Sequence, residues 1–450
     1  MEVPLSETSA ISKPSEEPRS MRVFFIIWAG QLISMLGSGL TNFALGVWIF
    51  DQTGKATPFA LTVLFGSLPR LLLSPLAGSL ADRWNRRLVM LLSDTGNAIV
   101  TLGAFLLLLG GNLQIWMIYL MAVLGSCFSA FQEPAYTASI TMLVPKKELT
   151  RASGLGNLSQ ALESMLTPLA AGFLFVLIGL RGIILIDFIT YFFAIGALLI
   201  VRIPQPKQAA TEAKTSPGGK VIQDAVYGWR YLRARSGLFG LLWFYALVNF
   251  FLNFSGVLLG PLVLSRYSAS EFGLVQMAVG LGILSGSLLL SAWGGPKGRK
   301  IPTVIGFIAL AGIGLTITGL SPQVLFIGLG MFVMLFSIPL ASGPSQAIFQ
   351  SKVAPDVQGR VFAIRGMISR SIMPIAFFLA GPLADRLLEP LMAVEGSLGV
   401  GFFGNLLGNG PGRGIGLGFV ISGLCLLVAC AWAYANPRLR LLEDEIPDAI

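Results

Sequence analysis

Twelve apolar runs, each long enough to cross a lipid bilayer, restrict the fold of this chain more than any other feature of its sequence. They cover residues 23–50, 58–80, 88–110, 115–133, 157–179, 182–202, 237–264, 272–292, 301–320, 323–348, 361–385 and 414–436. A bilayer core of ~30 Å requires about 20 helical residues. Because lipid offers the backbone no hydrogen-bonding partner, each run must be helical, and no alternating pattern of barrel strands is present. The sequence therefore predicts an all-α membrane protein with twelve transmembrane helices.

Composition excludes several classes of function. The chain is 54% hydrophobic and only 12% charged, and its basic residues are scattered between apolar runs instead of forming a patch with interleaved aromatics, which argues against nucleic-acid binding. It has no histidine, and its three cysteines lack metal-ligand spacing, so we expect no metal and no cofactor. The stretch GGPKGRK at 294–300 does not have the spacing of an ATP-binding loop. We therefore predict neither an ATP-driven pump nor an enzyme.

Basic residues predict the orientation. Of the 31 Lys and Arg residues, 23 lie in the tails and in the alternate links that share a side with the N-terminus, and 5 lie in the opposite links. The other three, Arg70, Arg365 and Arg370, lie inside spans. By the positive-inside rule both termini are predicted to be cytoplasmic, which agrees with an even number of spans.

Two sequence echoes indicate a duplicated six-helix unit. The segment 77–90 resembles 285–304, and the segment 143–151 resembles 352–360, at nearly the same displacement. We expect substrate to bind at the midplane between two halves that rock against each other. The predicted parts are a disordered tail (1–21), a six-helix bundle (22–202), a linker with a short amphipathic helix (203–235), a second bundle (236–436) and a C-terminal tail (437–450).

The link after the second span reads GSLADRWNRR and resembles the G-x-L-x-D-R-x-G-R-R signature of the major facilitator superfamily. Asn85 replaces the usual second glycine, and we expect it to tolerate the left-handed backbone. The resemblance implies a twelve-helix major facilitator fold, with a charge cluster that latches the cytoplasmic side when the transporter faces outward. The alternative is that the arginines only satisfy the positive-inside rule. The latch residues it implies are Gly78, Asp82, Arg83, Arg86 and Arg87, to which we add Asp94, early in the third span.

Further stretches resemble one branch of this superfamily, which holds bacterial macrolide-efflux proteins and the enterobactin exporter. They are 131–155, 186–195, 353–364, 380–386 and 410–417. Within them AGPLADR (380–386) looks like the latch motif but ends the eleventh span on the opposite side, so we expect only a structural helix end there.

The fifth span carries TPLAAG (167–172), which resembles the G-P-x-x-G-G element of drug:proton antiporters. Small residues here are expected to let helices of opposite halves meet closely, although ordinary small-residue packing explains the same pattern. The residues concerned are Thr167, Pro168 and Gly172.

Acidic residues inside spans are the candidates for proton coupling. A carboxyl group in a low-dielectric cavity can bind and release a proton near neutral pH as access alternates. We rank Glu163 first because it lies four residues before Thr167 on one helical face, then Glu133, then Asp187. A structural ion pair, for instance with Arg70, is the alternative for each. The fourth span lacks the arginine that many drug:proton antiporters carry.

Polar uncharged residues indicate the wall of a substrate cavity. In the first span they fall on one helical stripe, and in the seventh two asparagines lie beside phenylalanines. Hydrogen bonding between helices is the alternative explanation. A cavity of amides and aromatics suits an amphiphilic organic molecule. The predicted cavity residues are Gln31, Ser38, Asn42, Arg70, Asn249, Asn253 and Phe254.

Together these features predict a secondary active transporter in the bacterial cytoplasmic membrane. The resemblance implies export of an amphiphilic small molecule, such as a macrolide-like drug or a siderophore, by alternating access and proton antiport. A lysophospholipid or lipid flippase, or an uptake carrier of the same fold, is the alternative. We expect membrane lipids, the substrate and the proton to be its partners, and the protein to be monomeric.

Overall fold

The computed structural model describes residues 21–81, 84–201 and 226–448, and within these ranges the chain is helical with no β-strand. Eleven of the described helices are long and apolar enough to cross a membrane. The long helices are α1 (Met21–Thr53), α2 (Ala56–Ala81), α3 (Arg86–Leu109), α4 (Ile115–Leu143), α5 (Leu149–Ile200), α7 (Ser236–Leu264), α8 (Ala269–Trp293), α9 (Lys300–Leu320), α10 (Val324–Lys352), α11 (Gln358–Leu383) and α14 (Arg413–Ala435).

Short helical pieces lie in the links and in the C-terminal tail. They are the 3₁₀ turn Lys146–Glu148, the π-helical turn Ala384–Leu388, α12 (Glu389–Leu391), α13 (Phe402–Leu407), α15 (Pro437–Arg440) and α16 (Leu442–Glu445). Part of the predicted linker, 202–225, lies outside the described residues, and residues 226–233 form a further helix. That helix lies against the start of α11, where a Cβ on Gly228 would be 2.8 Å from the carbonyl oxygen of Arg360.

The 52-residue α5 contains two of the twelve predicted spans. It reverses at Gly179, where φ is 64° and ψ is −176°. This backbone region is open essentially to glycine alone, because any Cβ would clash there. Counting the two parts of α5 separately gives the twelve crossings that the apolar runs predict.

Contacts with α1 show that the two parts of α5 run in opposite directions. Before the turn, the indole of Trp28 donates to the carbonyl of Leu155, and Gly39 packs on Thr167, so this part runs parallel to α1. After the turn the pairs run antiparallel: Ser38 with Asp187, Gly37 with Thr190 and Gly30 with Ala197.

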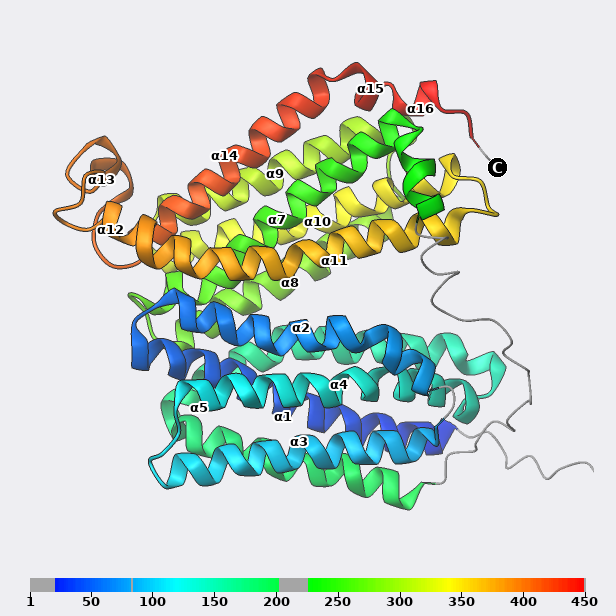
Figure 1. Ribbon diagram of the computed structural model, residues 1–450, viewed down its shortest axis with the longest axis vertical. Coiled ribbons are helices and arrows are strands. Elements are labelled where there is room, and N and C mark those ends of the chain that lie inside the picture. Colours follow the sequence, from blue (N-terminus) through cyan, green and yellow to red (C-terminus); the bar gives the residue numbers. More distant parts are fainter. Residues whose placement is uncertain (1–20, 82–83, 202–225, 449–450) are drawn as a thin grey trace, which may run out of the picture.

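The helices form two bundles side by side, α1–α5 in one half and α7–α11 with α14 in the other (Figure 1). We call the end that carries the links after α2, α4, α8 and α10 the basic end, and the opposite end the far end. Residues 437–446 fold back at the basic end against α9 (Figure 1). The predicted arrangement of twelve spans in two six-helix bundles is confirmed.

The halves are in close contact towards the far end. The largest apolar core fills the second half and continues into the first through Val47, Phe50 and Phe59. Phe43 of α1 stacks on Phe272 of α8, with ring centroids 4.8 Å apart. These apolar contacts close the far end of the space between the bundles.

Candidate functional site

A central cavity of about 840 Å³ lies between the two halves. Helices α1–α5 line it on one side, and α7, α8 and α11 line it on the other. Its wall mixes hydroxyl and amide groups with aromatic rings, among them Asn42, Asn97, Thr101, Asn253, Gln276, Phe59, Phe272 and Phe377. This volume falls in the range of ~300–1,000 Å³ that is usual for pockets binding drug-sized ligands.

Asp187 lies in the wall of the central cavity and is buried, with 1% of its surface exposed. Its Oδ1 accepts a hydrogen bond of 3.2 Å from the hydroxyl of Ser38, which also lies 3.0 Å from the hydroxyl of Tyr191. No described cationic side chain forms an ion pair with Asp187. Its polar partners are hydroxyl groups, so a proton on this carboxyl would not have to displace a fixed positive charge.

Arg70 and Glu133 form an ion pair between α2 and α4. Arg70 lines the central cavity, and both side chains are about half exposed, at 52% and 58%. Glu133, the second candidate for proton coupling, therefore forms the ion pair with Arg70 that was the alternative to a proton-coupling role. The pair also neutralises the positive charge that Arg70 would bring to the cavity.

Glu163 lines the central cavity from the first part of α5 and is partly buried. No hydrogen bond or ion pair joins it to another described side chain. Together with Asp187, it gives the cavity two carboxylates without an ion-pair partner, while its one arginine already has such a partner. The site can therefore take up protons or a cationic group.

Three predicted cavity residues lie elsewhere. Gln31 lies closer to the basic end than Ser38 and donates to Asp94 at 2.9 Å. The amide of Asn249 donates to the Tyr245 carbonyl of its own helix at 2.8 Å. Phe254 faces α14 and lines a separate small apolar cavity of about 180 Å³. The one-residue step from Asn253 rotates the side chain by ~100°, which carries Phe254 away from the centre.

Asp94 lies in a buried amide cluster, whereas Arg83, one of its two predicted arginine partners, lies outside the described residues. It is 1% exposed and accepts hydrogen bonds from the side-chain amides of Gln31 and Gln132. Gln132 in turn donates to Oε1 of Gln31 at 2.8 Å. The three side chains connect α1, α3 and α4 inside the first half.

The latch motif is described in part, because Asp82 and Arg83 lie outside the described residues. Arg86 donates to the Ala138 carbonyl of α4 at 2.8 Å. Arg87 donates to the carbonyls of Leu198 and Leu199, at 2.7 and 2.8 Å, at the end of α5. The Arg87 contacts satisfy carbonyls in the last turn of α5, as the macrodipole favours.

The structure adds two details of the latch motif. Asn85 is not left-handed: its φ is −64°, and its side chain accepts from the backbone N–H of Leu88 as the N-cap of α3. Asparagine is among the best N-cap residues. Outside its own helix, no described atom lies within 4 Å of the place that a Cβ on Gly78 would take, so Gly78 has no close contact with another described helix.

The helix-packing residues lie where α5 crosses α8. A Cβ on Gly172 would be 2.5 Å from the carbonyl oxygen of Ala269, and one on Gly273 equally close to that of Pro168. The two backbones therefore touch across the halves. Thr167 is buried beside this crossing and, like Pro168, lines the central cavity.

The structure adds residues that sequence reasoning missed. Gln132 donates to the buried carboxylate of Asp94, and Tyr191 bonds the Ser38 hydroxyl that donates to Asp187. Tyr191 could have been found because it lies one helical turn after Asp187. AGPLADR is more than a helix end: Asp385 binds the start of α2 in the other half. The resemblance of AGPLADR to the latch motif could have indicated this role from the sequence.

Among the described residues no cluster of His, Cys, Asp and Glu could hold a metal ion.

Comparisons with known proteins agree with this architecture. The family model of the Major Facilitator Superfamily matches residues 27–377. Macrolide efflux protein A from Streptococcus pyogenes is 31% identical over 376 residues, which cover 81% of this chain and 90% of that protein. A protein of the same name from Enterococcus faecalis is 31% identical over 334 residues, covering 72% and 99%.

A solved structure shares the fold. A bacterial homologue of the human lysosomal transporter Spinster, in an inward-facing and unoccupied conformation, superimposes with a TM-score of 0.68 at 15% identity. The match covers 96% of this chain and 99% of that one.

Proposed function

Because the chain belongs to the Major Facilitator Superfamily, a family of membrane transporters and not of enzymes, we propose that it exports an amphiphilic drug in exchange for protons. The similarity to macrolide efflux proteins over most of the chain supports drug efflux. Proton antiport rests on the carboxyl groups in the central cavity.

The observation that carries the proposal is the mixed lining of the central cavity. Aromatic rings such as Phe59, Phe272 and Phe377 offer apolar contact, and hydroxyls and amides offer hydrogen bonds. When ionised, Glu163 and Asp187 add negative charge to a cavity in which Arg70 and Glu133 already neutralise each other. This charge favours a substrate with a protonated amine, as in many macrolide-like drugs, over an anionic siderophore.

We propose that proton and drug compete for the carboxyl groups. When the cavity faces the cytoplasm, a cationic drug binds and the carboxyl of Glu163 gives up its proton. When the cavity faces outward, protonation of Glu163 removes the attraction and the drug leaves. Because Glu163 can bind either the proton or the drug but not both, proton import and drug export are coupled.

The test measures proton release on drug binding. Purified protein in weakly buffered detergent receives a macrolide with a basic amine, and, separately, an anionic siderophore and a lysolipid. We expect proton release with the macrolide, and its loss in Glu163→Gln although the drug still binds. The matched control is Glu148→Gln, the same change at the basic end in a residue close to Arg151.

Binding of the macrolide without proton release in the wild type would contradict proton exchange. Release that survives Glu163→Gln but vanishes in Asp187→Asn would move the coupling role to Asp187. A response to the lysolipid alone would support a lipid carrier of the same fold instead.

A further inference from the structure

Asp385, in the π-helical turn that ends α11, binds the start of α2 across the two halves. Its Oδ1 accepts from the backbone N–H of Ala56 and its Oδ2 from that of Thr57, both at 2.8 Å. These N–H groups belong to the first turn of α2, where no intrahelical acceptor is available. One carboxylate therefore provides both hydrogen bonds from more than 300 residues away in the sequence.

The backbones of α11 and α2 also touch at this point. A Cβ on Gly381 would lie 2.5 Å from the Cα of Thr57. Gly381 and Asp385 are four residues apart, so they lie on the same face of the chain and meet the same turn of α2. The glycine allows the approach, and the carboxylate binds the turn that it reaches.

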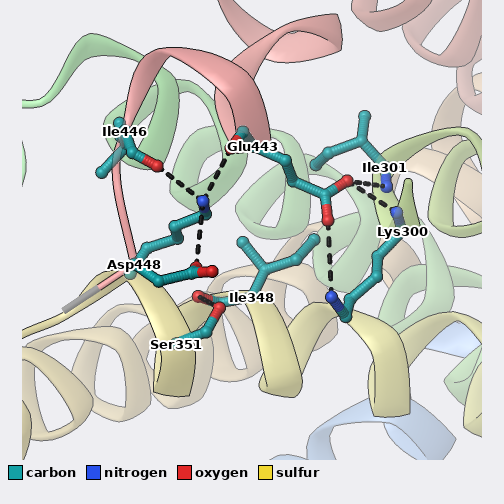
Figure 2. Close-up of polar contacts among 8 residues, drawn as sticks. Lys300, Ile301, Ile348, Ser351, Glu443, Ile446 and Asp448 are labelled. Carbon is teal, nitrogen blue, oxygen red and sulfur yellow. Dashed lines mark hydrogen bonds and ion pairs between the residues drawn. The ribbon is translucent and has the colours of Figure 1, made fainter. Parts of the chain in front are cut away.

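Two other helix starts are capped in the same way, but within one half. Glu443 Oε2 accepts from the N–H groups of Lys300 and Ile301 at 2.6 and 3.0 Å, at the start of α9 (Figure 2). Glu389 accepts from Gly412 and Ile415 at 3.1 and 2.8 Å, at the start of α14. A rocking motion leaves these two caps intact, because both partners move together. Of the three, the cap by Asp385 crosses the interface.

We propose that Asp385 is a clasp that holds the far end closed and must release each time the halves open there. Release exposes two backbone N–H groups and one carboxylate, so the clasp biases the equilibrium towards the closed far end. Loss of an N-cap acceptor shifts a helix equilibrium by about twofold to thirtyfold, and we expect a shift of this size in the ratio of the two states.

The test measures distances between spin labels in lipid nanodiscs, without any drug, after the three native cysteines are replaced by serine. One pair is placed at the far end (Gln52→Cys with Glu395→Cys) and another at the basic end (Lys147→Cys with Lys297→Cys); all four positions are exposed. In Asp385→Ala we expect longer far-end distances to gain population and basic-end distances to shorten.

Glu443→Ala is the matched control, because it removes a carboxylate that also accepts from two N–H groups at a helix start, but inside one half. It should leave both distance distributions unchanged. Asp385→Asn, which keeps one acceptor oxygen, should give an intermediate shift and serves if the alanine variant does not fold. Unchanged distances in folded Asp385 variants, or an equal shift in Glu443→Ala, would overturn the clasp. Since no substrate is used, either result leaves the proposed function to its own test.

Discussion

The acidic side chains of this protein differ in the groups that they bind. Glu133 pairs with an arginine, Asp385 binds two backbone N–H groups, and Asp187 has hydroxyl partners. An arginine holds a carboxylate in its charged form, whereas hydroxyls can serve either form because they donate and accept. The bonding partner of an acidic residue therefore indicates whether the residue has a structural role or is a candidate for proton exchange.

We expect Asp187→Asn and Asp187→Leu to behave differently. The amide retains a hydrogen-bonding partner for Ser38, so the asparagine variant should fold with nearly wild-type thermal stability. Leucine removes the acceptor and leaves the Ser38 hydroxyl with Tyr191 alone, so we expect a loss of ~0.5–1.5 kcal/mol in the free energy of unfolding, the net contribution of one hydrogen bond. Thermal unfolding in detergent measures the difference. Equal stability of the two variants would show that the Ser38–Asp187 hydrogen bond contributes nothing.

Helix boundaries and packing could largely be read from the sequence, whereas side-chain partners could not. The apolar runs located most span ends within a few residues, because lipid imposes one length and one backbone conformation. The exceptions are α4, which continues to Leu143 and not to 133, and α5, which begins at Leu149 and not at 157. Gln31 and Ser38 share one helical stripe, yet one bonds Asp94 and the other Asp187. Periodicity gives the face of a helix, but the neighbour at each depth depends on how the helices are assembled.

At the crossing of α5 and α8, Gly172 is required because the backbones of the two helices touch there, and not because its φ and ψ angles demand glycine. Gly172→Ala places a Cβ against the carbonyl oxygen of Ala269 and should destabilise the protein by ~1–3 kcal/mol, with loss of drug transport. The control is Gly196→Ala on the second part of α5, where nothing lies within 4 Å of the new methyl group. It should be neutral or slightly stabilising, because alanine favours helix.

Thermal unfolding and transport into inverted vesicles measure both variants. Wild-type behaviour of Gly172→Ala would mean that the crossing is looser than described. An equal loss in Gly196→Ala would assign the effect to helix propensity or lipid contact.

Across the whole molecule, positive charge predicts which end faces the cytoplasm. We expect the basic end to be cytoplasmic, since 23 of the 31 basic residues lie in the tails and links on that side. A membrane-impermeant thiol reagent on intact cells should therefore label Glu395→Cys and spare Lys297→Cys until the cells are opened. The background lacks Cys127, Cys425 and Cys430. The reverse pattern would invert the topology and with it the proposed direction of transport.

The reversal at Gly179 bears on how this protein is made. The two parts of α5 are joined by a single-residue turn, so there is no loop that could remain on the far side of the membrane while the second part is synthesised. We therefore expect the two parts of α5 to enter the bilayer together, as one helical hairpin. We expect a substitution of Gly179 to impair the insertion of this hairpin and so to lower the amount of protein in the membrane, before transport can be affected.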